Sequence, residues 1–167
     1  VPFVGVNHLE GHMLSPLLEA EVPEWPFLAL VVSGGHTTLY CCEALGSYQI
    51  LGATVDDAAG EAFDKVARMM RLGYPGGPIV DDLAKEGNPE AVAFPRPLPK
   101  KSQRAFDFSF SGLKTAVRNH LVRTDKASDV DVCASFQAAV VDCLLTRIKQ
   151  AAKQTGVTQL ALAGGVA

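Results

Sequence analysis

The sequence has 167 residues, 48% of them hydrophobic and 20% charged, and a formal net charge of −3. These values are typical of one globular domain with a buried core, and the acidic balance argues against a domain that coats nucleic acid through overall positive charge. No apolar run reaches the length of a membrane span, so we expect no membrane segment.

The four cysteines do not form a metal-binding or disulfide framework. Cys41 and Cys42 are adjacent, which makes a poor metal clamp, and neither Cys133 nor Cys143 belongs to a C-x-x-C pair. We expect reduced, mostly buried thiols, as in a cytoplasmic protein.

Both ends of the sequence predict strands that belong inside a fold. The apolar residues 1–6 indicate a first strand, and the sequence stops after an apolar strand at 159–163, within the glycine turn Gly164-Gly165. Because domains rarely end at such a point, we expect this sequence to be part of a longer protein.

Residues 8–18 predict a helix that carries two histidines. Asn7 is a favourable N-cap, and Glu10 completes a capping-box pattern. His8 and His12 lie one turn apart on the face opposite the apolar stripe, where two imidazoles can hold one metal ion if a third ligand comes from elsewhere. A solvated pair of histidines is the alternative. Glu10 does not follow His8 directly, as it would in H-E-x-x-H, so it cannot be assumed to be a protease base.

Residues 27–40 predict a β-hairpin around two adjacent glycines. The apolar run 27–32 enters the turn, and a β-branched apolar run leaves it. Gly34 and Gly35 would let the backbone take a positive φ and approach a ligand, and consecutive N–H groups in such a turn can bind an anion. A hairpin turn that binds nothing is the alternative.

A strand at 47–52 and a helix at 56–70 follow the hairpin. The next turn, at 74–78, leads into a helix that begins near Pro78. Near the start of that helix, a ligand-facing role for Gly77 and Asp81 and a simple turn-and-cap role are equally open.

The proline-rich, basic segment 94–104 predicts an exposed loop, either an RNA contact or a simple connection. Ser128 and Gly156 are the expected start and stop signals of a long helix. The other expected elements are a strand edge at 106–110, a helix at 111–121 and the strand at 159–163.

The predicted order of elements gives an α/β fold with a mixed sheet and flanking helices. Glycine turns follow the strands that end at Val32 and Ala163, and such a pair suits a nucleotide phosphate held between lobes. The arrangement resembles the actin/Hsp70/sugar-kinase architecture, which is ribonuclease H-like, and we expect the sequence to hold an incomplete copy of it.

Six motifs resemble the tRNA threonylcarbamoyladenosine biosynthesis transferases, once labelled O-sialoglycoprotein endopeptidases, in their bacterial form. They occur in the family's order and cover the whole chain, so residues 1–167 are expected to form a partial domain of this glycoprotease family. The motifs are NHLEGH at 7–12, VSGGHT at 32–37, DDAAGEAFDK at 56–65, YPGGP at 74–78, FDFSFSGLK at 106–114 and AGGV at 163–166.

The resemblance implies transfer of a threonylcarbamoyl group from threonylcarbamoyl-AMP to the exocyclic amine of the adenosine beside the anticodon, in tRNAs that read codons beginning with A. It implies partner proteins of the same pathway, including an inactive paralogue and an ATPase. The family's third metal ligand, an aspartate, and an asparagine contact fall beyond Ala167. The implied site residues are His8 and His12 for one metal ion, iron or zinc; Val31, Val32, Ser33, Gly34 and Gly35 for the adenylate; and Asp64, Gly77 and Asp81 for substrate.

The implied chemistry agrees with the residue types. A metal held by histidines can polarise the carbonyl under attack, and a glycine turn can hold the phosphate of the leaving AMP. No protein nucleophile is evident, so we expect direct attack by the tRNA amine.

Three alternatives stay open: a metalloprotease, which the offset Glu10 disfavours; a related carbamoyltransferase that acts on another substrate; and a non-enzymatic ATP-binding module, which should lack the histidine pair.

Overall fold

The computed structural model describes residues 1–99, 102–123 and 127–167. Part of the basic loop predicted at 94–104 therefore lies outside the described residues. The elements, in chain order, are α1 (His8–Leu14), the 3₁₀ helix η1 (Ser15–Leu18), β1 (Phe27–Val32), β2 (Thr37–Ala44), β3 (Ser47–Ala53), α2 (Ala59–Met69), α3 (Gly76–Ala84), α4 (Ser111–Leu121), α5 (Asp129–Thr155) and β4 (Leu160–Ala163).

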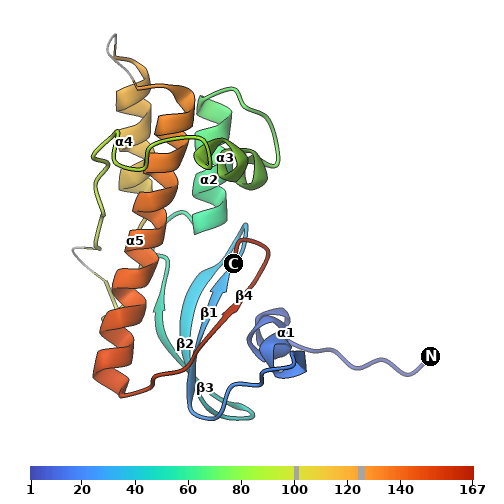
Figure 1. Cartoon of the computed structure of the whole chain (residues 1–167). Coiled ribbons are helices and arrows are strands. Elements are labelled where there is room, and N and C mark those ends of the chain that lie inside the picture. The colour runs from blue at the N-terminus through green and yellow to red at the C-terminus, as the bar shows by residue number, and fades with distance from the viewer. Residues whose placement is uncertain (100–101, 124–126) are drawn as a thin grey trace.

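The strands form one mixed sheet in the order β3-β2-β1-β4, which confirms the predicted α/β class (Figure 1). β1 pairs antiparallel with β2 and parallel with β4, and β2 pairs antiparallel with β3. Because β1 has neighbours on both sides and is covered on both faces, all six of its residues are buried.

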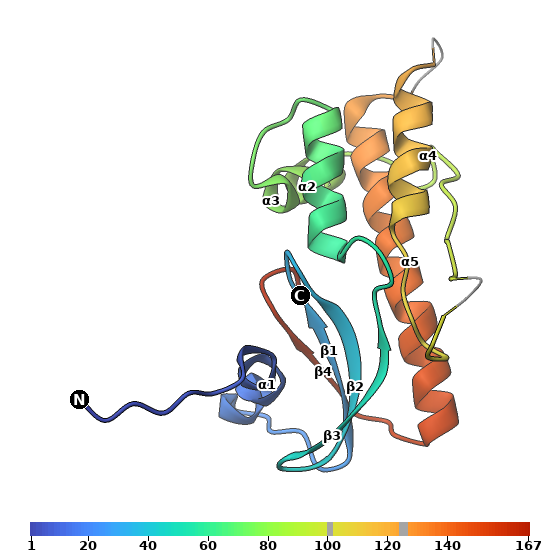
Figure 2. The same cartoon turned by 180° about the vertical axis from the view of Figure 1, so that it is seen from behind.

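Alternate residues of β1 face two different layers of the core. Leu28, Leu30 and Val32 belong to the larger apolar cluster, with side chains of α2, α4 and α5. Phe27, Ala29 and Val31 belong to a smaller cluster with Met13 of α1. Figures 1 and 2 accordingly show α5 along one side of the sheet and α1 on the other.

The long helix α5 begins and ends where its local signals predict. The side chain of Ser128 accepts a hydrogen bond from the Asp131 backbone N–H, and Gly156 closes the helix with a φ of 74°. β4 is the next element and pairs parallel with β1, with Ala161 and Ala163 buried. Leu160 and Leu162 are 39% and 55% exposed, so the apolar strand predicted at 159–163 is buried only at alternate positions.

Two predicted strands are absent from the described residues. Residues 1–6 are extended but unpaired and exposed, and residues 106–110 make only an isolated bridge, between Phe108 and Thr54. The predicted helix at 8–18 becomes 3₁₀ from Ser15, since Pro16 has no N–H for an α-helical bond. The predicted helix at 56–70 begins only at Ala59, since Asp56 and Asp57 are used in other contacts described below.

All four cysteines are free and buried, which confirms their predicted burial. Burial raises the pKa of Cys42, Cys133 and Cys143 to about 11, which keeps these thiols protonated and poorly reactive. No helix in the described part of the chain is both long and apolar enough to cross a membrane.

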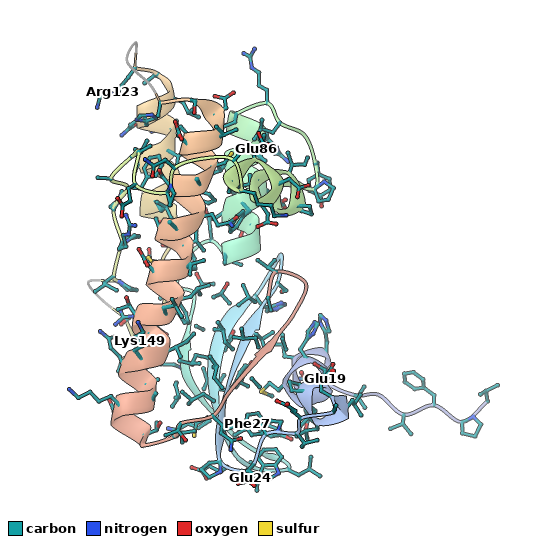
Figure 3. All side chains as sticks on the ribbon, in the orientation of Figure 1. Glu19, Glu24, Phe27, Glu86, Arg123 and Lys149 are labelled. Atoms are coloured by element: carbon teal, nitrogen blue, oxygen red, sulfur yellow. The ribbon has the colours of Figure 1, made fainter. Side chains whose placement is uncertain are left out.

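The single tryptophan lies at the start of the hairpin. The Trp25 ring packs on the Phe27 ring with centroids 4.7 Å apart. Phe27, labelled in Figure 3, opens β1 at the end of the sheet that lies away from α2 and α3.

Candidate functional site

A pocket of about 830 Å³ opens where the two glycine turns meet the helices. Gly34 comes from the turn after β1 and Gly165 from the turn after β4. Asp64 comes from α2, and Gly77 and Asp81 come from α3. The structure therefore brings together residues from four separate motifs of the sequence around one cavity.

The two glycine turns are held against the end of β1 by close backbone packing. A Cβ at Gly60 of α2 would lie 2.8 Å from the Gly34 Cα, so only a glycine lets α2 approach the first turn this closely. Gly164 has a φ of 105°, and a Cβ there would lie 2.2 Å from the Val32 carbonyl oxygen. The Val166 N–H donates to that same oxygen at 3.1 Å, which fixes the second turn beside the first.

The first turn is closed by its own hydrogen bonds. The His36 N–H donates to Ser33 Oγ at 3.1 Å, and the Ser33 N–H donates to the His36 carbonyl at 2.8 Å. Neither Gly34 nor Gly35 takes a positive φ, so that prediction is wrong. A Cβ at either glycine would meet no described atom within 4 Å. The turn therefore offers an open backbone surface rather than a strained one.

The other predicted residues of this segment are placed differently. Val31 and Val32 are 0% and 3% exposed, and their side chains face the core. Neither valine lines the pocket, and neither does Ser33. Any contact that the valines make with a ligand must come from their backbone.

Asp64 fixes the turn that precedes α3. Its Oδ1 accepts a hydrogen bond from the Gly76 N–H at 2.7 Å. Gly76 packs so tightly on α2 that a Cβ would lie 2.6 Å from the Ala67 Cβ. The Asp64 carboxylate thus has a structural role at one oxygen while it lines the pocket.

Asp81 is held by two partners on opposite oxygens. Its Oδ2 pairs with Lys85 Nζ at 3.0 Å, and its Oδ1 accepts from the Gln137 amide, also at 3.0 Å. The Lys85 hydrogen bond, followed by that of Gln137, lowers the pKa of Asp81, so this carboxyl group is charged at neutral pH.

α5 contributes a mainly apolar wall with one polar side chain. Gln137, Val140, Val141 and Leu144 recur at helical spacing along the pocket. Tyr74, which is 78% exposed, stands at its rim. The sequence reasoning missed Gln137 and Tyr74; an isolated amide on an otherwise apolar helix face is the signal that could have found Gln137.

The histidines lie outside the pocket lining but close to the first turn. The His8 and His12 rings have centroids 4.6 Å apart, and the His36 ring lies 6.3 Å from His8, edge-on. The sequence reasoning assigned no role to His36. In the described part of the chain, no three His, Cys, Asp or Glu side chains are close enough together to hold a metal ion.

The remaining acidic residues of the 56–65 motif have structural partners. Asp56 accepts hydrogen bonds from the Phe110 and Ser111 N–H groups at the start of α4. Asp57 lies between Lys65 and Lys114 at 2.7 and 2.8 Å. Burial opposes the charge of Asp57, but the hydrogen bonds from the two lysines lower its pKa overall.

Comparison with known proteins assigns the chain to a family. The family model described as tRNA N6-adenosine threonylcarbamoyltransferase matches residues 1–167. The chain belongs to the tRNA N6-adenosine threonylcarbamoyltransferase family. This match agrees with the resemblance drawn from the motifs.

Three relatives in the threonylcarbamoyltransferase family carry that same name. Those from Geotalea uraniireducens and Syntrophotalea carbinolica are each 55% identical to this chain, and that from Pelobacter propionicus is 56% identical. Each match covers 100% of this chain and 49% of the relative. The chain therefore spans about half the length of the curated relatives that it matches.

Four residues that the resemblance to the threonylcarbamoyltransferases assigned to adenylate or substrate binding line the pocket: Gly34, Asp64, Gly77 and Asp81. Gly35 lies in the same exposed turn. His8 and His12 are adjacent to each other but form a separate group beside that turn. Their roles in binding stay predictions.

Proposed function

We propose that the full-length protein transfers a threonylcarbamoyl group from threonylcarbamoyl-AMP to the exocyclic amine of the adenosine beside the anticodon, in tRNAs that read codons beginning with A. The observation that carries this proposal is the convergence of Gly34 and Gly165 with Asp64, Gly77 and Asp81 around one pocket. The names of the relatives support transfer of a threonylcarbamoyl group to N6 of a tRNA adenosine.

The pocket suits an adenylate in size and chemistry. Its volume of about 830 Å³ lies within the range usual for small-molecule sites, which is roughly 300–1,000 Å³. Glycine backbone at Gly34 and Gly165 can approach a phosphate without steric hindrance, and the apolar wall of α5 can cover a base. The charged Asp81 carboxylate can accept hydrogen bonds from ribose hydroxyls.

The proposed reaction needs no covalent enzyme intermediate. The adenosine amine attacks the carbamoyl carbon, the bond from that carbon to the phosphate oxygen breaks, AMP leaves with the electron pair, and the amine loses a proton. Among the described residues that line the pocket there is no serine, cysteine, lysine or histidine to act as a nucleophile. Direct attack by tRNA is therefore the simplest route.

We also propose that His8 and His12 bind one metal ion, iron or zinc, with further ligands from outside this chain. Their ring centroids lie 4.6 Å apart, with the ring planes tilted by 52°. A bound metal would supply a Lewis acid near the glycine turn. In the full-length protein, the double variant His8→Ala/His12→Ala should lose bound metal by elemental analysis, and unchanged metal content would contradict the assignment.

The direct test is incorporation of labelled threonine into unmodified tRNA by the full-length protein, with the rest of the pathway supplied. The proposed partners are the pathway's other proteins, including an inactive paralogue and an ATPase, and the proposed compartment is the cytoplasm. Carbamoyl-adenylate offered in place of threonylcarbamoyl-adenylate separates this function from that of a related carbamoyltransferase. Absence of labelled tRNA, with transfer to another acceptor, would overturn the proposal.

A further inference from the structure

Gln137 is the one polar side chain that α5 places in the pocket. It precedes Val140, Val141 and Leu144 on the same helix face, all of them apolar. Its amide nitrogen donates to Asp81 Oδ1 at 3.0 Å and so joins α5 to α3 across the pocket wall. A polar group on such a face needs a partner, and Asp81 supplies it.

The second partner of Asp81 is Lys85, which contacts the other carboxylate oxygen. Lys85, the C-cap residue of α3, has a side chain that is 63% exposed and also pairs with the exposed Asp82. An exposed ion pair of this kind constrains geometry weakly, because solvent screens it and the lysine side chain is long. Without Gln137, only this exposed ion pair would hold the Asp81 carboxylate.

We propose that Gln137 is a positioning residue for the nucleotide. Its amide holds the Asp81 carboxylate in the orientation that accepts the ribose hydroxyls of the adenylate. This inference rests on the proposed function, since it names the residue that makes Asp81 effective in the same pocket.

The test uses the full-length protein and two commercial probes, AMP and 2′,3′-dideoxy-AMP, with dissociation constants measured by calorimetry. The wild-type protein should bind the dideoxy compound about tenfold more weakly, because a hydrogen bond to a charged carboxylate is lost. In Gln137→Leu, AMP should bind about tenfold more weakly, whereas the dideoxy compound should bind as before. The ratio of the two dissociation constants, that of the dideoxy compound divided by that of AMP, should therefore fall from about ten to about one.

Two matched variants separate positioning from a general effect on the helix or on charge. Gln154→Leu makes the same substitution at an exposed position of α5 away from the pocket, and it should keep the wild-type ratio. Lys85→Met removes the other partner of Asp81 and should keep most of the ratio, because the pair is exposed.

Gln137→Glu serves as the second variant if Gln137→Leu does not fold, as judged by thermal melting. It keeps the shape of the side chain but sets a like charge beside Asp81, so it too should bring the ratio of the two dissociation constants close to one. A folded Gln137 variant that keeps the full wild-type ratio would overturn this inference and leave the proposed function standing. Failure of the wild-type protein to bind AMP would overturn both.

Discussion

At the scale of single residues, two glycines near the same turn have opposite constraints. Gly35 has open space at its Cβ position, whereas a Cβ at Gly60 would lie 2.8 Å from the Ser33 carbonyl oxygen and the Gly34 Cα. Gly60 is therefore required by packing, and the requirement at Gly35 can come only from what approaches the turn.

We predict that Gly35→Val in the full-length protein leaves the unfolding midpoint unchanged but weakens AMP binding, because the new side chain occupies the space that the phosphate would approach. Gly60→Ala, the matched control, should lower the free energy of unfolding by about 1–3 kcal/mol, since backbone atoms must move. Urea unfolding and calorimetry measure both effects. Unaltered AMP affinity in a folded Gly35→Val protein would mean that the turn is only a hairpin connection.

Asp64 is expected to affect stability as well as binding. Asp64→Ala removes the acceptor of the buried Gly76 N–H and should cost about 1–2 kcal/mol in the free energy of unfolding. Asp64→Asn keeps an acceptor oxygen and should cost less. If the two variants unfold at the same urea concentration as wild type, the hydrogen bond to Gly76 does not hold the turn before α3.

At the scale of elements, α4 depends on an acidic side chain that is distant in sequence. The Asp56 carboxylate accepts hydrogen bonds from the backbone N–H groups at the start of α4. It also accepts hydrogen bonds from the hydroxyl groups of Ser109 and Ser111. Partial burial alone would raise the pKa of Asp56, but these hydrogen bonds lower it overall. The charged form is therefore the one that stabilises the fold.

The sign of the pH effect follows from that lowered pKa. The contribution of Asp56 is fully present above the pKa of the unfolded chain, about 3.9, and is lost as the pH falls through the lower folded value. Asp56→Asn should cost about 1 kcal/mol at pH 7, a figure reduced for solvent exposure, and progressively less below pH 4. Urea midpoints of both proteins at pH 7 and pH 3 check this, and a constant difference would contradict it.

Three helix ends were predictable from the sequence because their signals are local. Asn7, Ser128 and Gly156 act within a few residues of themselves, and each caps its helix as expected. Strands depend on partners elsewhere in the chain. The apolar residues 1–6 have the right composition but meet no neighbouring strand, and residues 106–110 touch the sheet at one point only.

The residues of the candidate site also fall into two groups, those that short motifs predicted and those that the sequence did not reveal. Gly34 and Gly77 came from short motifs in which the spacing of the residues is informative, and both line the pocket. Gln137 and His36 were missed because the residues that link them to the site, Asp81 and His8, lie 56 and 28 residues away in the sequence. No pattern within one helix or turn reveals such a contact.

At the scale of the whole molecule, β4 forms one edge of the sheet and exposes Leu160 and Leu162. We predict that residues 1–167 expressed alone self-associate through this edge, because unpaired strand groups and apolar side chains favour pairing between copies. Light scattering after gel filtration should show oligomers, and Leu162→Lys should reduce them. A monomer at high concentration would show that the edge is adequately protected.

The same isolated chain should not modify tRNA. The pocket would keep its glycine turns and aspartates, but the metal would have only His8 and His12 from this chain, and positioning by the rest of the protein would be lost. Labelled threonine should therefore not enter unmodified tRNA when residues 1–167 replace the full-length protein. Turnover near the full-length rate would show that the active site has been misplaced.

The position of Trp25 decides what intrinsic fluorescence can report. Trp25 packs on Phe27 at the start of β1, whereas both glycine turns lie beyond Val32 at its other end. The emission of Trp25 in this chain should therefore change when the sheet unfolds and stay constant as a nucleotide fills the pocket. An optical binding assay needs a reporter on the nucleotide, and the tryptophan signal can serve within the same cuvette as the internal standard for folding.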